Sequence, residues 1–202
     1  MNIISVPALV YAHHVKRPKF NVYYPSVRGL SNAYIQQHIN RSLIYDTNKL
    51  IAKQGYPQNP LADITAHFEV KTNERDILSI ALINYSFSGG AHGLTVIKSL
   101  TWNTQTGKLY ALRDLFQPGA PYVKTLSDLV EQQIRERDLP LLDEFKGIRP
   151  DQDYYIADKA LVLYFQLYEL TPYAYGFPYF PISVYAIQDI IDENGPLGKM
   201  LY

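Results

Sequence analysis

Cysteine is absent from all 202 residues of the chain. Its absence excludes disulfide bonds and any chemistry that needs a thiolate, but it leaves the compartment open, because many exported bacterial proteins also lack cysteine. Net charge is absent as well, since 19 basic residues balance 19 acidic ones. We therefore expect neither nucleic acid nor an acidic membrane surface as the partner.

Long apolar runs are missing too, because none approaches the roughly 18 residues that a membrane span needs. The segment from Ile3 to Ala12 has about the length of a signal-peptide core, and Val10-Tyr11-Ala12 is similar to a cleavage site. However, no lysine or arginine precedes Lys16, and Pro7 interrupts the run. We favour an N-terminal strand over a signal peptide.

Tyrosine is instead abundant, at 18 residues against 8 phenylalanines and 1 tryptophan. A ring with a hydroxyl suits half-buried sheet faces and amphipathic binding surfaces. Packing in a β-rich fold accounts for most of these tyrosines.

Apolar periodicity predicts two strands, a helix and three further strands in the first half of the chain. The helix begins near Leu30 with Ser31 or Asn32 as its N-cap, and Gly55 and Pro57 end it. Its predicted apolar stripe is Ile35, Ile39, Leu43, Ile44, Leu50 and Ile51. The strands are expected at 3–12, at 19–24 up to Pro25, over an antiparallel hairpin at 62–86, and at 94–102.

The second half is predicted to contain a helix over about 121–137, with a short continuation over 139–145. Strands over 154–157, 160–167 and 181–184 follow, and then a helical turn from Ala186 to Ile191. Strands grouped around two helices favour an α+β fold, with a mainly antiparallel sheet packed against two main helices. We expect one domain over 1–202, or two halves of about 1–90 and 91–202 that share one core.

Two segments far apart in the sequence carry a signature. The first holds Ser88-Gly89-Gly90-Ala91-His92, Thr104-Gln105-Thr106-Gly107-Lys108 and Leu112-Arg113-Asp114-Leu115-Phe116; the second holds Tyr164-Phe165, Tyr168-Glu169, Pro172-Tyr173-Ala174 and Gly176. In this order they resemble an extracytoplasmic bacterial domain that occurs in RsiV-like anti-sigma factors and beside the catalytic domain of PdaC-type peptidoglycan deacetylases. Tyr24-Pro25, Gly29-Leu30, Asn32 and Ile39-Asn40 are similar to its N-terminal strand and helix.

The resemblance implies an extracytoplasmic recognition or accessory module, which in the anti-sigma factors binds lysozyme. Those proteins carry a sigma-binding segment and a membrane span before this domain, and the deacetylases carry a separate catalytic domain. We expect none of these parts in this chain.

The signature also offers weak catalytic candidates, namely His92 with Glu169 or Asp114 as a carboxylate partner. The alternative is structural: the glycines shape a bend and His92 ties loops together by hydrogen bonds. On this alternative Gly89, Gly90, His92, Gly107, Asp114, Pro172 and Gly176 are scaffold residues. The five histidines show no spacing typical of metal ligands, so we expect no metal and no cofactor.

An aromatic segment supplies the candidate binding residues: Tyr168, Tyr173, Tyr175, Phe177 and Tyr179. Pro172, Gly176 and Pro178 interrupt regular structure there, and rings on such a loop can stack on sugars or anchor a protein. The alternative is that the loop folds back and caps the sheet.

Our leading hypothesis is a non-catalytic recognition module of the bacterial cell envelope, which binds a lysozyme-like protein or a cell-wall glycan. The first alternative is a small hydrolase or deacetylase-like enzyme that uses His92 and Glu169. The second is a cytoplasmic protein of the same fold with another partner.

Overall fold

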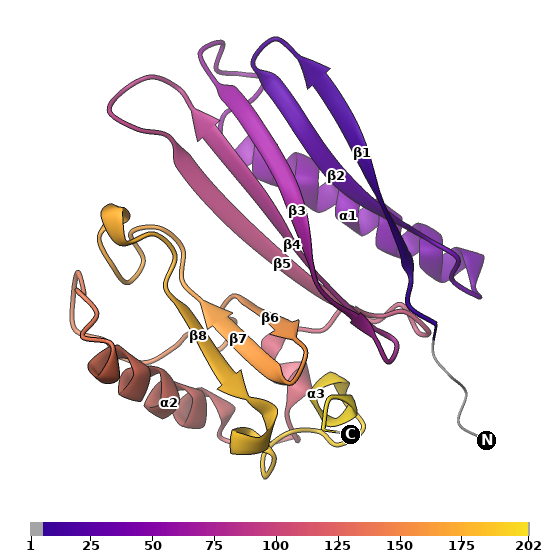
Figure 1. Ribbon diagram of the computed structural model, residues 1–202, viewed down its shortest axis with the longest axis vertical. Helices are drawn as coiled ribbons and strands as arrows, with labels where there is room; N and C mark the ends of the chain where they lie inside the picture. Colours follow the sequence, from indigo (N-terminus) through magenta and orange to yellow (C-terminus); the bar gives the residue numbers. More distant parts are fainter. Residues whose placement is uncertain (1–5, 202) are drawn as a thin grey trace. The chain divides into compact units, whose positions relative to one another are not determined.

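The computed structural model describes residues 6–201, which form two compact units, one ending at Leu109 and the other beginning at Tyr110 (Figure 1). Each unit combines strands with one main helix. The strands form a mixed sheet of five strands and an antiparallel sheet of three. The predicted α+β class with two main helices is therefore confirmed.

The sheet of the first unit has the order β1-β2-β3-β4-β5. All neighbours are antiparallel except β2 and β3, and the helix α1 provides the crossover that parallel neighbours require. The elements are β1 (Leu9–Arg17), β2 (Phe20–Arg28), α1 (Ala33–Lys53), β3 (Asp63–Glu74), β4 (Ile77–Phe87) and β5 (Leu94–Asn103). The predicted hairpin and third strand are confirmed as β3, β4 and β5.

The core of this unit lies between α1 and the sheet. Buried aliphatic side chains surround the ring of Trp102, which has no exposed surface. The cluster consists of Ala8, Val27, Ile39, Leu43, Leu50, Leu78, Ile80, Leu82, Leu100 and Trp102. Burial of this apolar surface is the main source of stability for the unit.

The helix α1 begins where the sequence predicts. The Asn32 Oδ1 atom accepts hydrogen bonds from the N–H groups of Tyr34 at 2.9 Å and Ile35 at 3.3 Å, as an N-cap residue does. The predicted stripe is wrong at Ile44, which is 45% exposed. Ile44 directly follows Leu43 in the helix, so it points away when Leu43 faces the sheet.

The strands β1 and β2 extend further than predicted. Pro25 does not close β2, because the strand continues to Arg28. The strand tolerates this proline because β2 pairs with β3 only as far as Val22. Beyond Val22, the edge of β2 that faces β3 needs no backbone N–H donor. Residues 3–5 of the predicted first strand lie outside the described residues, and residues 6–8 are not in a strand.

The second unit contains an antiparallel sheet of order β6-β7-β8 and the helix α2. Leu126, Val130 and Ile134 form the buried side of α2. The elements are η1 (Leu112–Leu115), α2 (Tyr122–Glu136), β6 (Tyr154–Ala157), β7 (Ala160–Tyr164), η2 (Tyr173–Tyr175), β8 (Tyr179–Ser183), η3 (Val184–Ile187) and α3 (Pro196–Lys199). The second predicted helix and the last three strands are thus present.

Two boundaries of this unit were predicted wrongly. Residues 139–145 do not continue the helix, because Asp138 takes a φ of +47° directly after α2 and Pro140 has no N–H group to donate. Strand β7 ends at Tyr164 instead of residue 167. The N–H group of Phe165 donates to the carbonyl of Pro178, outside any strand, and that of Gln166 donates to the Glu169 carboxylate.

The predicted closing helical turn from Ala186 to Ile191 is found earlier, as η3. Among the helices of residues 6–201, none is both long enough and apolar enough to cross a membrane.

Candidate functional site

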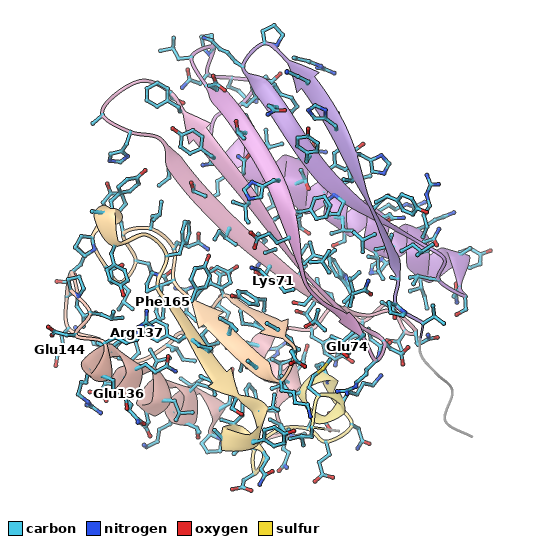
Figure 2. The ribbon with its side chains drawn as sticks, viewed as in Figure 1. Lys71, Glu74, Glu136, Arg137, Glu144 and Phe165 are labelled. Carbon is cyan, nitrogen blue, oxygen red and sulfur yellow. The ribbon has the colours of Figure 1, made fainter. Side chains whose placement is uncertain are left out.

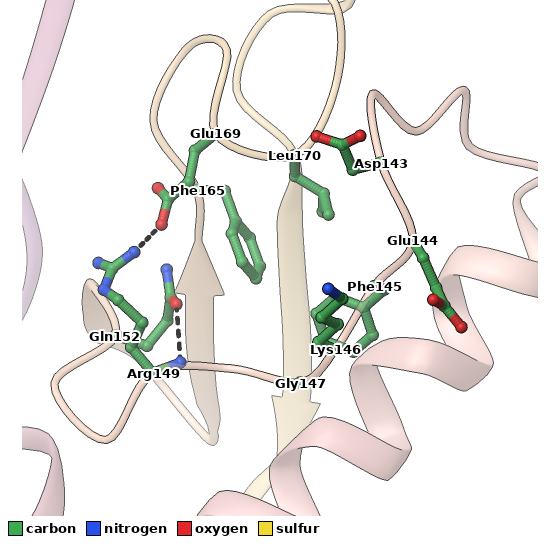
Figure 3. A pocket seen from close by; sticks show the side chains of 10 residues that line it. All are labelled: Asp143, Glu144, Phe145, Lys146, Gly147, Arg149, Gln152, Phe165, Glu169 and Leu170. Carbon is green, nitrogen blue, oxygen red and sulfur yellow. Dashed lines mark hydrogen bonds and ion pairs between the residues drawn. The ribbon is translucent and has the colours of Figure 1, made fainter.

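The second unit contains a pocket of about 180 Å³ beside the end of β7 (Figure 3). Two irregular segments form it: the chain that follows α2 and the loop that follows β7. The lining residues are Asp143, Glu144, Phe145, Lys146, Gly147, Arg149, Gln152, Phe165, Glu169 and Leu170.

The wall after α2 is held against that helix by Gly147 and its neighbour. Gly147 has a φ of +104°, and a Cβ atom there would lie 3.0 Å from the Ser127 hydroxyl oxygen. That oxygen accepts a hydrogen bond from the N–H group of Ile148 at 3.0 Å. Because a side chain would both strain the backbone and crowd Ser127, this approach requires glycine.

A chain of polar contacts connects the two walls. Gln152, which is only 1% exposed, donates from Nε2 to the carbonyl of Tyr164 at 2.8 Å and accepts from the N–H group of Arg149 at 3.3 Å. The Arg149 guanidinium pairs with the Glu169 carboxylate, whose other oxygen accepts from the N–H group of Gln166 at 2.7 Å. These side chains supply hydrogen-bond partners to backbone groups on irregular chain. The bonds therefore fix the shape of the pocket.

The floor of the pocket is apolar. Phe165 and Leu170 are 4% and 6% exposed. The Phe165 ring meets the edges of Phe145 and Phe180, with ring centroids 6.3 and 5.6 Å apart. Such packed rings hold the floor rigid.

The rim carries charges of both signs. Asp143, Glu144 and Lys146 are exposed, and within residues 6–201 none of them makes a hydrogen bond or ion pair. Arg149 and Glu169 already neutralise each other. The pocket therefore combines an apolar floor with unpaired carboxylates and an unpaired ammonium group.

The predicted aromatic residues divide into two groups. Tyr168, Tyr173 and Tyr175 lie on the irregular segment after the pocket, where Tyr168 and Tyr175 are 50% and 40% exposed. The rings of Tyr168 and Tyr173 lie 5.5 Å apart. Phe177 and Tyr179 are half-buried instead, and the Tyr179 ring packs beside other rings of the sheet. Tyr168, Tyr173 and Tyr175, of which Tyr173 is also half-buried, supply an aromatic surface, which we call the tyrosine loop, while Phe177 and Tyr179 cover the sheet.

Arg137, at the end of α2, ties this segment to the helix (Figure 2). Its Nη1 atom donates to the carbonyl of Tyr179 at 2.7 Å, and its guanidinium lies 5.2 Å from the ring centre of Phe180. A weaker contact reaches the Tyr175 hydroxyl at 3.4 Å. The tyrosine loop is thus contacted at Tyr175 by a charged side chain that no sequence pattern selects.

The three catalytic candidates each have local structural partners. His92 is exposed in the loop between β4 and β5, and its Nδ1 atom lies 2.9 Å from the carbonyl oxygen of Gly93. Asp114 accepts from the N–H group of Ala111 at 3.0 Å and closes η1. Glu169 lies in the pocket and pairs with Arg149. His92 belongs to the first unit, whereas Asp114 and Glu169 belong to the second and have different partners.

The glycines and proline of the signature occupy turns. Gly89, Gly90, Gly107 and Gly176 all have positive φ angles. Gly107 closes a turn in which Asn103 Oδ1 accepts from the N–H groups of Gln105 and Thr106, at 2.8 and 2.9 Å. Pro172 precedes η2, the helical turn of the tyrosine loop.

No group of three His, Asp or Glu side chains within residues 6–201 is placed to hold a metal ion. The adjacent His13 and His14 each have their own partner on β2: His13 Nε2 lies 2.7 Å from Ser26 Oγ, and His14 Nε2 lies 2.8 Å from Asn21 Oδ1.

Sequence reasoning selected Glu169 but missed Arg149, Gln152 and the rim charges. They lie in a stretch without apolar periodicity, 143–152, so no pattern assigned them a neighbour. The available signal was the position of Arg149 between Gly147 and Pro150, because glycine and proline mark irregular chain on which binding residues are often placed.

Two family models match different parts of the chain. Residues 16–95 match the family described as deacetylase PdaC, and residues 113–185 match the protein family of unknown function DUF3298. The first match lies within the first unit and the second match within the second unit.

Two proteins of Bacillus subtilis strain 168 are similar to the chain. The anti-sigma-V factor RsiV is 27% identical over 183 residues, which cover 83% of this chain and 63% of that protein. The peptidoglycan-N-acetylmuramic acid deacetylase PdaC is 22% identical over 139 residues, which cover 65% of this chain and 30% of that protein. The chain therefore matches less than two thirds of the length of either relative.

Two crystal structures of DUF3298 family proteins have the same fold. The one from Bacteroides fragilis NCTC 9343 has a TM-score of 0.73 at 14% identity and covers 96% of this chain and 97% of that one. The one from Pseudomonas aeruginosa PAO1 has a TM-score of 0.65 at 16% identity and covers 96% of each. The chain therefore combines a PdaC N-terminal domain with a DUF3298 domain, as in RsiV and PdaC, and these 202 residues include no catalytic deacetylase domain.

Proposed function

We propose that the chain is a non-catalytic recognition domain of the bacterial cell envelope, which binds a lysozyme-like protein or a cell-wall glycan. The main support is the similarity to the anti-sigma-V factor RsiV, which extends across both units. The relative PdaC, whose name gives peptidoglycan as its substrate, connects the family to the cell wall.

The tyrosine loop is the proposed contact surface. Tyr168 and Tyr175 are exposed, and Tyr173 lies against Tyr168 on the same segment. Amphipathic rings that are held in place contribute strongly to protein interfaces, and their faces also stack on sugars. Arg137 supports the loop from α2, so a partner meets a surface that is already arranged.

Binding measurements on the full chain test this proposal. The ligands are a lysozyme-type muramidase and soluble peptidoglycan fragments, each titrated by calorimetry. We expect Tyr168→Ala and Tyr173→Ala to weaken binding about fivefold or more, as truncation of an interface anchor does. Tyr34→Ala is the matched control, because Tyr34 is 85% exposed on α1, outside the tyrosine loop.

Absence of binding to both ligands at high micromolar concentration would exclude the proposal. The enzymatic alternative requires His92 and Glu169 to act together, so a peptidoglycan hydrolysis or deacetylation activity that His92→Ala abolishes would favour it. Native protein found only in the cytosolic fraction would favour the cytoplasmic alternative.

A further inference from the structure

The pocket beside Phe165 has the size of a site for one side chain. Its volume is about 180 Å³. Sites that enclose a whole drug-sized ligand measure about 300–1,000 Å³. The pocket therefore suits a single group that projects from a larger ligand.

The two side chains at the floor favour an apolar group at this position. Phe165 and Leu170 are nearly fully buried and present carbon atoms to the cavity. A polar group placed there would lose its water without gaining a partner from these two side chains. An aliphatic or aromatic side chain would bury apolar surface instead.

The charges at the rim determine which charged groups the ligand needs on either side of its apolar group. Figure 3 shows the Asp143 carboxylate directed toward Leu170, and Lys146 beside Phe145. Neither has a hydrogen bond or ion pair within the described part of the chain. A ligand that covers the rim removes water from both charges, so a favourable ligand brings both a cation and an anion.

A neutral sugar supplies neither charge, and an anionic sugar leaves Asp143 unpaired. A short peptide carries an amino group, a carboxylate and an apolar side chain within a few bonds of each other. Of the three unpaired rim charges, the Glu144 carboxylate is directed away from Phe165 and Leu170 (Figure 3). The cavity for one side chain and the two remaining rim charges of opposite sign therefore favour a peptide ligand.

We propose that this pocket anchors a peptide, with one apolar side chain on Phe165 and Leu170, a cation at Asp143 and an anion at Lys146. This assignment rests on the proposed recognition function and specifies peptide as the ligand class of this site. The Arg149–Glu169 pair holds the adjacent walls together and takes no ligand charge, because each partner already has its counterion.

Nuclear magnetic resonance of the ¹⁵N-labelled full chain tests the assignment. The probes are the dipeptide leucyl-leucine, its form blocked as the N-acetyl amide, and the trisaccharide of N-acetylglucosamine. At about 10 mM, we expect the free dipeptide to shift the amide signals of Gly147 and Leu170, and the blocked form to bind about fivefold more weakly, because two surface ion pairs are lost.

Charge variants provide the second measurement. Asp143→Lys and Lys146→Glu should each weaken dipeptide binding about two- to fivefold, since each replaces an attraction by a repulsion. Asp189→Lys and Lys16→Glu make the same changes at other exposed residues, whose side chains have no hydrogen bond or ion pair within residues 6–201, and should leave binding unchanged. All four positions are exposed, so the variants are expected to fold.

The assignment is wrong if the free dipeptide leaves Gly147 and Leu170 unshifted, or if the blocked form binds equally well. It is also wrong if the trisaccharide shifts these amides and the dipeptide does not, because the pocket would then take a glycan. Muramidase binding is measured in a separate experiment. A negative result with the dipeptide alone contradicts the peptide site, whereas absence of binding to both the muramidase and the peptidoglycan fragments contradicts the recognition function.

Discussion

The two units differ in how they satisfy their backbone. In the first unit five long strands pair along four ladders of one sheet, and a hollow of only about 10 Å³ lies between α1 and the sheet. In the second unit the segments 137–153 and 165–178 are mostly irregular, and they surround a pocket of about 180 Å³.

The difference shows where a binding pocket comes from in this fold. Paired strands need no side chain to complete their hydrogen bonds, so their side chains are available for packing. Irregular chain needs side-chain partners, and here Ser127, Gln152 and Glu169 supply them to Ile148, Arg149 and Gln166. The polar side chains that supply these hydrogen bonds therefore lie around the apolar floor of the pocket.

The largest expected effect tests the packing of the first unit. Trp102→Ala removes the largest fully buried side chain and should lower the free energy of unfolding by about 3–5 kcal/mol. Urea denaturation followed by circular dichroism measures this change.

Trp102→Phe is its control. The indole Nε1 atom is buried and finds no hydrogen-bond partner in residues 6–201, so phenylalanine removes an unsatisfied donor while it keeps most of the apolar surface. The loss should be clearly smaller than for alanine. Equal losses would contradict the view that the apolar surface kept by phenylalanine provides most of the stabilisation.

The intermediate effect concerns the irregular chain of the second unit. Gly176 has a φ of +80° and a ψ of −148°, a combination that side chains strongly disfavour. Gly176→Ala should therefore cost about 1–3 kcal/mol of unfolding free energy, although no atom lies within 4 Å of the added carbon.

Ala174→Ser, on the same loop at an exposed position, is the matched control and should change the unfolding free energy little. A neutral Gly176→Ala variant would mean that the tyrosine loop adapts its backbone, and that its shape is not fixed before a partner binds.

The smallest expected effect is the coupling free energy within a single ion pair. We compare a pair on the irregular chain with a pair on a regular helix. A double-mutant cycle of Arg149→Ala and Glu169→Ala should give a coupling of about 0.2–1 kcal/mol, because the two side chains are 49% and 22% exposed. The Lys124–Asp128 pair on α2, at 77% and 60% exposed, should couple by about 0.3–0.5 kcal/mol or less.

Thermal unfolding at low and high salt measures both couplings. If the coupling between Arg149 and Glu169 does not exceed that of the helical pair, this ion pair contributes no more to the free energy of unfolding than a solvated surface pair does.

The regular elements were predictable because their signals are local. The N-cap Asn32, the positive φ at Gly107 and the alternation in the β3–β4 hairpin follow from neighbouring residues alone. Ile44 and Pro25 were misjudged because exposure and strand length depend on partners from elsewhere in the fold.

The pocket was only partly predictable. Glu169 was selected by its place in the signature, but its partner Arg149 is 20 residues away on chain without periodicity. The prediction of a helical continuation over 139–145 also placed Asp143 in a helix, so this residue was not expected on an irregular segment at the rim of the pocket. Which side chain completes an irregular backbone is decided by tertiary structure, and sequence patterns do not record it.

The edge of the larger sheet has a consequence for self-association. β1 is the outermost strand in the order β1-β2-β3-β4-β5, so one side of its nine residues has no strand neighbour in the described sheet. Such an edge is a template on which a second chain can add. The side chains Lys16 and Arg17 place positive charge at its end, and a strand added there would remove water from these cations, which opposes the addition. Solubility at high protein concentration is thus expected to depend on these two cations.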